Sequence, residues 1–203
     1  MPFMDASEVK KGKIVIISGP SGVGKSTICK EIVARRKDVC LSISITTRPK
    51  SEAEVDGRDY WFISQEEFKE RIGKGLFLEY AKVFGYLYGT PRDKVEEMLR
   101  ACRTVILEID VQGARQVKAI YPDAVMIFIL PPSAKVLAER INNRGRDAAE
   151  LAEKRLDFAS TEIAAAWQYY EYMVVNEDLQ QAIEECIQII EDAGGEKNAK
   201  SGS

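Results

Sequence analysis

The sequence predicts an α/β fold in which helices flank a mainly parallel β-sheet. Short apolar segments alternate with helical patterns along most of the chain. A glycine-rich segment separates the first apolar segment from the first helical pattern, and two acidic residues close a later apolar segment. At 203 residues, with 45% hydrophobic residues, the chain is long enough to form one domain with insertions.

The core elements are predicted from apolar runs and from the spacing of apolar residues. The closing helix has one apolar face from Leu179 to Ile190, and the segment before it is a short apolar run. One core strand ends in two acidic residues, Glu108 and Asp110, and we expect the glycine-rich segment and Asp110 to lie at the carboxyl ends of strands, where ligands bind in such sheets. We expect core strands at 13–18, 104–110, 124–130 and 173–176, and core helices at 25–36, 112–120 and 133–142.

The segment 44–90 is predicted to be a small α+β insertion between core elements. Ser64 and Glu67 have the spacing of a capping box that begins a helix. Thr90 and Pro91 are predicted to be the N-cap and the first residue of the next helix. Around them we expect strands at 40–47, 60–63, 77–83 and 86–88 and a helix at 64–72.

The glycine-rich segment 19–27 has the composition and context of a phosphate-binding P-loop. Its glycines let backbone N–H groups face inward, and the helix that follows offers further N–H donors to an anion. Lys25 can reach the β and γ phosphates of a nucleotide, and the Ser26 hydroxyl can ligate a magnesium ion. The candidate phosphate-binding residues are Gly19, Pro20, Ser21, Gly22, Val23, Gly24, Lys25, Ser26 and Thr27.

Composition excludes several other classes of chemistry. The chain has no histidine, which excludes a Ser-His-Asp triad, a Cys-His pair and HExxH zinc chemistry.

The net charge of −3 argues against nucleic acid or an acidic membrane as a partner. The apolar runs are too short to span a bilayer, and no secretory signal is evident at residues 1–13, so we expect a cytoplasmic protein. The sequence gives no indication of oligomeric state.

Several motifs together resemble the guanylate kinase family over about residues 12–192. They include the P-loop, Ile45-Thr46-Thr47-Arg48, Glu54-Val55-Asp56-Gly57-Arg58-Asp59-Tyr60, Phe77-Leu78-Glu79-Tyr80, Tyr88-Gly89-Thr90, Ile109-Asp110-Val111-Gln112-Gly113 and Val174-Val175-Asn176. The resemblance implies transfer of the ATP γ-phosphoryl group to GMP with Mg²⁺. It also implies a P-loop core at 12–43, 91–139 and 161–192, a GMP-binding domain at 44–90, a lid at 140–160, and tails at 1–11 and 193–203 that we expect to be flexible.

The resemblance also implies a role for individual residues. A carboxylate at Glu79 suits the guanine edge, because it can accept hydrogen bonds from N1–H and from the 2-amino group. Ser44 and Thr90 match the hydroxyls near O6, and Asp110 matches the carboxylate near the base amino group. The GMP phosphate is expected at Arg48, Tyr60 and Tyr88, and the ATP site is expected to include Asn176.

One position departs from the family pattern. A second arginine usually follows three residues after Arg48, and this chain has Ser51 there. Serine cannot supply the missing charge, so we hypothesise that Lys50 partly substitutes for it at the GMP phosphate.

The expected mechanism needs no general base, because a phosphate monoester with a second pKa near ~6 is mostly dianionic at neutral pH. The difficulty is to bring this anion against ATP, which requires positive charge. The candidate catalytic cations are Lys25, Arg48, Arg140, Arg144 and Arg155.

Two alternatives remain open. One is a guanylate-kinase-like module that binds a partner without catalysis, although such modules lack a working P-loop. The other is a different small P-loop kinase that acts on a phosphorylated sugar, which would leave Glu79, Ser44 and Thr90 without a purpose.

Overall fold

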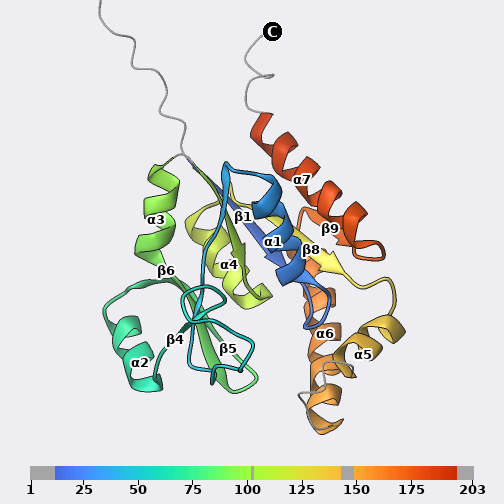
Figure 1. The fold of residues 1–203 in the computed structure, drawn as a ribbon, viewed down its shortest axis with the longest axis horizontal. Helices are drawn as coiled ribbons and strands as arrows, with labels where there is room; N and C mark the ends of the chain where they lie inside the picture. The colour runs from blue at the N-terminus through green and yellow to red at the C-terminus, as the bar shows by residue number, and fades with distance from the viewer. Residues whose placement is uncertain (1–11, 102, 143–148, 196–203) are drawn as a thin grey trace, which may run out of the picture.

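The computed structural model describes residues 12–101, 103–142 and 149–195 (Figure 1). Its core is a five-stranded sheet in the order β2-β7-β1-β8-β9, and all four strand pairings in it are parallel. The predicted mainly parallel sheet is therefore confirmed. The strands of this sheet are β1 (Lys13–Ser18), β2 (Val39–Leu41), β7 (Thr104–Glu108), β8 (Val125–Leu130) and β9 (Tyr172–Val175).

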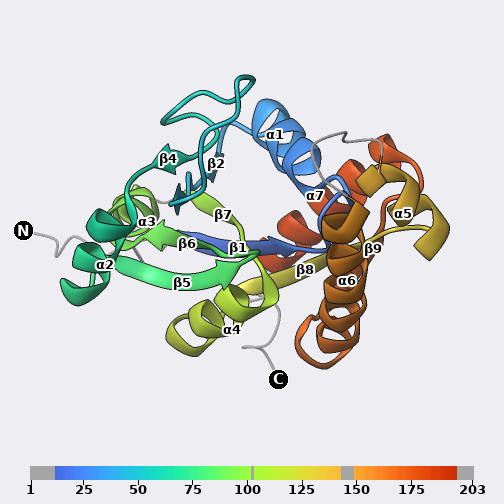
Figure 2. The same ribbon diagram turned by 90° about the horizontal axis from the view of Figure 1, so that it is seen from below.

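Helices cover both faces of the core sheet because side chains alternate along each strand. In β1, Val15 and Ile17 pack on one face and Ile14 and Ile16 on the other. Figure 2 shows α1 and α4 on opposite sides of this sheet. The first face holds α1 (Lys25–Arg35) and α7 (Leu179–Gly195), and the second holds residues from α3 (Arg92–Arg100), α4 (Val111–Ile120) and α6 (Ala149–Tyr169).

The inserted segment forms a second sheet in the order β4-β3-β6-β5. Its own small core contains Ile45, Phe68 and Phe77, and the rings of Phe68 and Phe77 stack with centroids 4.4 Å apart. Ser64 caps α2 (Gln65–Gly73) by accepting a hydrogen bond from the Glu67 N–H, as the capping box predicts. The strands are β3 (Ile45–Thr46), β4 (Trp61–Phe62), β5 (Phe77–Val83) and β6 (Tyr86–Pro91).

Two sequence predictions in this region are wrong. The single strand expected at 40–47 is two strands, β2 and β3, which belong to different sheets. The alternating pattern is real, but the chain passes from one sheet to the other between them. Thr90 and Pro91 belong to β6, and Pro91 rather than Thr90 is the N-cap of α3. The Thr90 hydroxyl instead donates a hydrogen bond to Oε1 of Glu79, so a contact between two strands replaces the expected helix cap.

The remaining helices lie at the far end of the molecule from α2 (Figures 1 and 2). Helix α5 (Ala134–Asn142) packs on α6 through Leu137, Ile141 and Ala159. No helix in the described part of the chain is both long and apolar enough to cross a membrane.

Candidate active site

The glycine-rich loop joins the carboxyl end of β1 to the amino end of α1. Gly24 precedes α1 with φ 106°, a left-handed conformation that favours glycine. A Cβ at this position would lie 2.6 Å from Nδ2 of Asn176, so the close approach also requires glycine. Among the described residues, no side chain caps the first turn of α1. Its N–H groups therefore remain available to an anion.

Lys25 and Ser26 lie at the start of α1, and both make internal contacts. The Lys25 amine donates to the carbonyl oxygens of Gly19 and Pro20, the second at 3.1 Å. The Ser26 hydroxyl donates to Oε1 of Glu108 at 2.6 Å. Glu108 ends β7, the parallel neighbour of β1, and it pairs in register with Ile17. The loop therefore brings a cation and a pair of oxygen ligands to one edge of the sheet.

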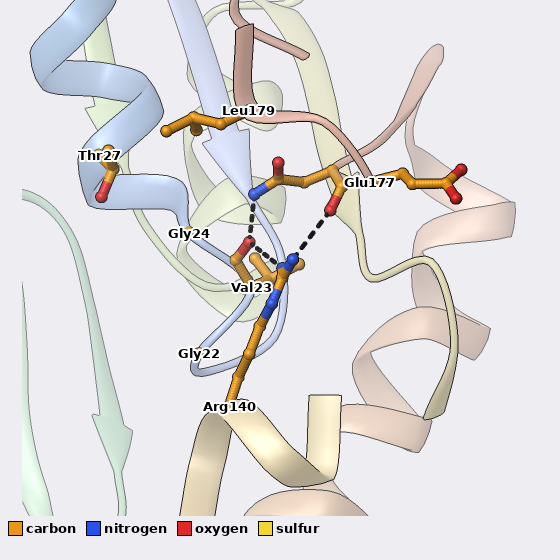
Figure 3. Close-up of a pocket in the computed structure, with 8 residues that line it drawn as sticks. Gly22, Val23, Gly24, Thr27, Arg140, Glu177 and Leu179 are labelled. Atoms are coloured by element: carbon orange, nitrogen blue, oxygen red, sulfur yellow. Dashed lines mark hydrogen bonds between the residues drawn. The ribbon is translucent and has the colours of Figure 1, made fainter. Parts of the chain in front are cut away.

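A small pocket of about 250 Å³ lies behind the loop (Figure 3). The Val23 carbonyl accepts hydrogen bonds from Nδ2 of Asn176 at 2.7 Å and from Arg140 at 3.4 Å. Arg140 also donates to the Asn176 carbonyl at 3.3 Å. Of the residues predicted for the phosphate and ATP site, this pocket is lined by Gly22, Val23, Gly24, Thr27, Arg140 and Asn176.

A larger cleft of about 860 Å³ lies in front of the loop, between the core and the insertion. It is lined by most of the predicted site residues, including Gly22 and Gly24, which also line the small pocket. The predicted residues that line the cleft are Gly19, Ser21, Gly22, Gly24, Lys25, Ser26, Ser44, Arg48, Tyr60, Glu79, Tyr88, Asp110 and Arg155. Pro20 contributes only through its carbonyl, and Arg144 lies outside the described residues.

Glu79 is the most deeply buried carboxylate of the cleft, with only 4% of its surface exposed. Its Oε1 atom accepts a hydrogen bond from the Thr90 hydroxyl at 2.5 Å. Burial raises the pKa of Glu79 to about 7, and the nearby Asp110 carboxylate acts in the same direction. A buried carboxylate of this kind is costly unless a ligand supplies hydrogen-bond donors.

Asp110 and Gly113 shape the wall against which Glu79 lies. Asp110 is the N-cap of α4 and accepts a hydrogen bond from the Gly113 N–H at 2.8 Å. A Cβ at Gly113 would lie 2.3 Å from Oε2 of Glu79. The glycine in the first turn of α4 therefore makes room for the Glu79 carboxylate.

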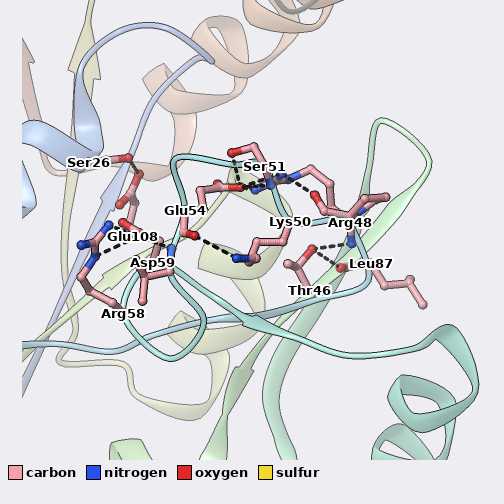
Figure 4. A network of polar contacts seen from close by, with 12 residues as sticks. Ser26, Thr46, Arg48, Lys50, Ser51, Glu54, Arg58, Asp59, Leu87 and Glu108 are labelled. Carbon is pink, nitrogen blue, oxygen red and sulfur yellow. Dashed lines mark hydrogen bonds and ion pairs between the residues drawn. The ribbon is translucent and has the colours of Figure 1, made fainter.

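Arg48 is held in place by an ion pair with Glu54 (Figure 4). Two guanidinium nitrogens donate to the two Glu54 oxygens at 2.6 and 3.1 Å, and the guanidinium lies 5.5 Å from the Tyr60 ring centroid. Partial burial alone would raise the pKa of Glu54, but hydrogen bonds from Arg48 and Ser51 lower it to about 2. Arg48 is thus a fixed cation beside Tyr60 and Tyr88, whose rings meet edge to face at 5.9 Å.

Ser51 and Lys50, the two residues considered in place of the second arginine, both contact Glu54. The Ser51 hydroxyl donates to Oε2 of Glu54 at 2.7 Å, and the Lys50 amine donates to the Glu54 carbonyl at 3.3 Å. Lys50 is exposed and does not line the cleft, which leaves its role at a phosphate as a prediction. Lys30 and Arg58 do line the cleft, and both form ion pairs with Asp59.

Two carboxylates of the site were not singled out from the sequence. The sequence shows Glu108 only as an acidic residue at a strand end, and the pairing of β7 with β1 is what brings it beside the P-loop. Glu162 lines the cleft with 7% of its surface exposed, and burial raises its pKa to about 7. Glu162 shares the buried face of α6 with Ala159 and Ala166, and a charge on such a face is itself a signal.

Comparisons with known proteins agree with this geometry. The family model described as guanylate kinase matches residues 11–193. The chain belongs to the guanylate kinase family. It is 49% identical over 173 residues to a guanylate kinase from Carboxydothermus hydrogenoformans, covering 85% of this chain and 84% of that protein. It is 46% identical over 180 residues to one from Thermosynechococcus vestitus, covering 89% and 94%.

A solved structure supports the fold as well. The crystal structure of guanylate kinase from Anaplasma phagocytophilum matches with a TM-score of 0.77 at 30% identity. The match covers 95% of this chain and 89% of that chain. The fold of this chain therefore matches that of a solved guanylate kinase over nearly its whole length.

The buried carboxylates predict a distinctive pH dependence of stability. Between pH 4.5 and 7, native Glu79 and Glu162 hold protons that the unfolded chain releases, so the free energy of unfolding should fall as the pH rises. Each group can contribute up to about 3 kcal/mol. The lowered pKa of Glu54 acts at more acidic pH and does not overlap this range. Urea unfolding at several pH values should show a smaller fall for Glu79→Gln; a slope equal to that of the wild type would contradict the assignment.

Proposed function

We propose that this protein transfers the γ-phosphoryl group of ATP to GMP, giving ADP and GDP. The observation that carries the proposal is the buried Glu79 carboxylate, held by Thr90 and close to Asp110 at the end of a cleft that begins at the P-loop. Membership in the guanylate kinase family supports it. The intact P-loop residues Gly19, Gly24, Lys25 and Ser26 argue against a module that only binds a partner, because such modules lack a working P-loop.

Glu79 selects guanine by hydrogen-bond chemistry. Guanine presents two donors on one edge, N1–H and the 2-amino group, and an ionised carboxylate accepts both. Adenine offers an acceptor at N1 and has no 2-amino group, so it would leave Glu79 buried and unpaired. A buried carboxylate left without a donor reduces the binding free energy of the wrong base far more than a lost apolar contact would, so this pairing is an effective basis for specificity. Ser44, Thr90 and Asp110 complete the set of polar groups around the base.

The GMP phosphate binds at Arg48, Tyr60 and Tyr88. The guanidinium of Arg48 matches a phosphate oxygen pair, and its bond to Glu54 fixes its orientation before the ligand arrives. The phenols add neutral donors. Burial raises the pKa of Tyr60, so its proton stays in place as a hydrogen-bond donor.

Mg²⁺ would be held by Ser26 and Glu108 together with the nucleotide phosphates. The fit is supported by the pair of oxygen ligands already in contact at 2.6 Å. Among the described residues no group of three or more acidic, cysteine or histidine side chains could hold a metal alone, which suits an ion that shares its ligands with phosphates. When bound, the ion neutralises charge on the ATP phosphates.

The protein residues act mainly by positioning and by supplying positive charge. Lys25 turns from the loop carbonyls to the ATP phosphates, and the dianionic GMP phosphate attacks without a general base. Arg155 donates to the Ser21 hydroxyl at 3.3 Å, so it lies beside the P-loop. Arg140 and Asn176 line the small pocket, where the nucleoside part of ATP would lie next to its phosphates. Arg144 remains a further candidate cation.

The insertion at 44–90 is expected to act as the GMP-binding domain and the segment 140–160 as a lid. Closure of both around the substrates would exclude water and limit wasteful ATP hydrolysis.

An acceptor screen tests the proposal. ADP release with Mg²⁺ and ATP should occur with GMP and not with AMP, CMP or UMP. Glu79→Gln keeps one acceptor and loses the charge, so kcat/KM for GMP should fall by about 10²- to 10³-fold. Glu70→Gln, an exposed carboxylate of the same insertion, is the matched control and should retain activity. ADP release with a phosphorylated sugar but with no nucleoside monophosphate would favour the other kinase class, and no ADP release at all would favour a binding module.

The room that Gly113 leaves for Glu79 gives a second test. Gly113→Ala would place a methyl group against Oε2 of Glu79, so KM for GMP should rise by about tenfold or more, while KM for ATP stays close to the wild-type value. Gly73→Ala is the control, because a Cβ there meets nothing within 4 Å. Steady-state kinetics with each substrate varied would measure both effects. Equal kinetics for the two variants would contradict the packing argument.

A further inference from the structure

The turn between β5 and β6 contacts α6 across the cleft. The proposed function gives no role to the aromatic residues at this contact. Phe84 and Gly85 form this two-residue turn, with φ 47° and 88°. The Phe84 ring contacts the Phe158 ring edge to face, with centroids 5.4 Å apart. It also faces the Arg155 guanidinium, whose central carbon lies 5.4 Å from the ring centroid.

Phe84 is an unusual residue for this turn. Two successive residues with positive φ favour Asn-Gly or Gly-Gly, because a bulky side chain is strained in the left-handed region. Phe84 is the one non-glycine residue with positive φ in the described part of the chain. Its side chain is 36% exposed, so it is not simply a core residue. The contacts that offset the local strain are those with α6.

Arg155 connects this aromatic contact to the P-loop. Its Nη1 atom donates to the Ser21 hydroxyl at 3.3 Å while its planar group lies by the Phe84 ring. Phe84, Arg155 and Ser21 all border the same cleft, yet they come from the insertion, α6 and the core. Three parts of the molecule that are distant in sequence therefore meet at one guanidinium group.

An aromatic partner suits a cation that has to bind phosphate. A ring face attracts a guanidinium through its quadrupole without occupying the N–H groups at the edge of the guanidinium plane.

We propose that Phe84 is a positioning residue for Arg155. The ring, carried by the insertion, lies against α6 and holds the Arg155 guanidinium beside the P-loop, where the phosphates would bind. The acceptor-binding insertion and the placement of this cation are then linked by direct contact. The inference rests on the proposed function and extends it, because it connects the acceptor-binding insertion to the donor site.

The experiment compares substitutions that separate packing from the cation–ring contact. Phe84→Leu keeps an apolar side chain and removes the ring face, so kcat and kcat/KM for ATP should fall together, by about 5- to 20-fold. Phe84→Tyr keeps the ring face and should restore rates close to the wild type. Phe84→Leu should cause no further loss in an Arg155→Ala background, because the two side chains act as one unit.

A matched control is available at the far end of the same helix. Tyr169 of α6 makes the same kind of contact with Arg115 of α4, with the guanidinium 4.5 Å from the ring centroid, and it does not line the cleft. Tyr169→Ala should leave kcat unchanged.

Three outcomes would overturn the inference. They are an unchanged kcat in Phe84→Leu, a Phe84→Tyr variant as slow as Phe84→Leu, and losses from Phe84→Leu and Arg155→Ala that multiply. A wild-type protein without GMP-dependent ADP release would instead overturn the proposed function, and this inference with it.

Discussion

The site depends on one buried negative charge. Glu79 lies in an apolar setting where its only described hydrogen bond comes from Thr90, and burial raises its pKa to about 7. Two features of the surrounding structure accommodate the Glu79 carboxylate. Gly113 leaves space for it, and the β5–β6 hairpin places Thr90 opposite Glu79 on the paired strand. A guanine edge with two donors would relieve the cost of burial, so binding energy and specificity come from the same constraint.

The cations of the cleft supply the positive charge that the phosphate groups require. Lys25 donates to carbonyls of its own loop, Arg48 is held by Glu54, and Arg155 lies between Ser21 and an aromatic ring. Each is oriented by a contact inside the protein before any phosphate arrives. Such preorganisation lowers the cost of reorganising charge during the reaction.

The sequence predicted the core well because local signals there agree with the tertiary structure. The apolar runs predict β1, β7 and β8, and the glycine-rich segment is correctly predicted to join β1 to α1. The predictions failed where tertiary contacts override local preference. The alternating run at 40–47 contributes to two sheets, and Thr90 has the local chemistry of a helix cap but serves Glu79 instead.

Two other features of the site do not follow from hydrophobic periodicity. Phe84 contradicts the usual chemistry of its turn, and its contact with Arg155 joins segments about 70 residues apart, so periodicity could not reveal it. Glu162 would have been noticed only by asking why a charge lies on the apolar face of a helix.

Proton release on GMP binding is the most direct test of the central claim. Since Glu79 is about half protonated near pH 7 when free, and guanine requires the ionised carboxylate, GMP should displace about half a proton from it. Calorimetric titration at pH 7 in buffers of different ionisation enthalpy would measure this release, and Glu79→Gln corrects for protons that the GMP phosphate itself loses. We predict a release larger in the wild type by about half a proton. Equal release in the two proteins, with GMP bound to both, would contradict the account.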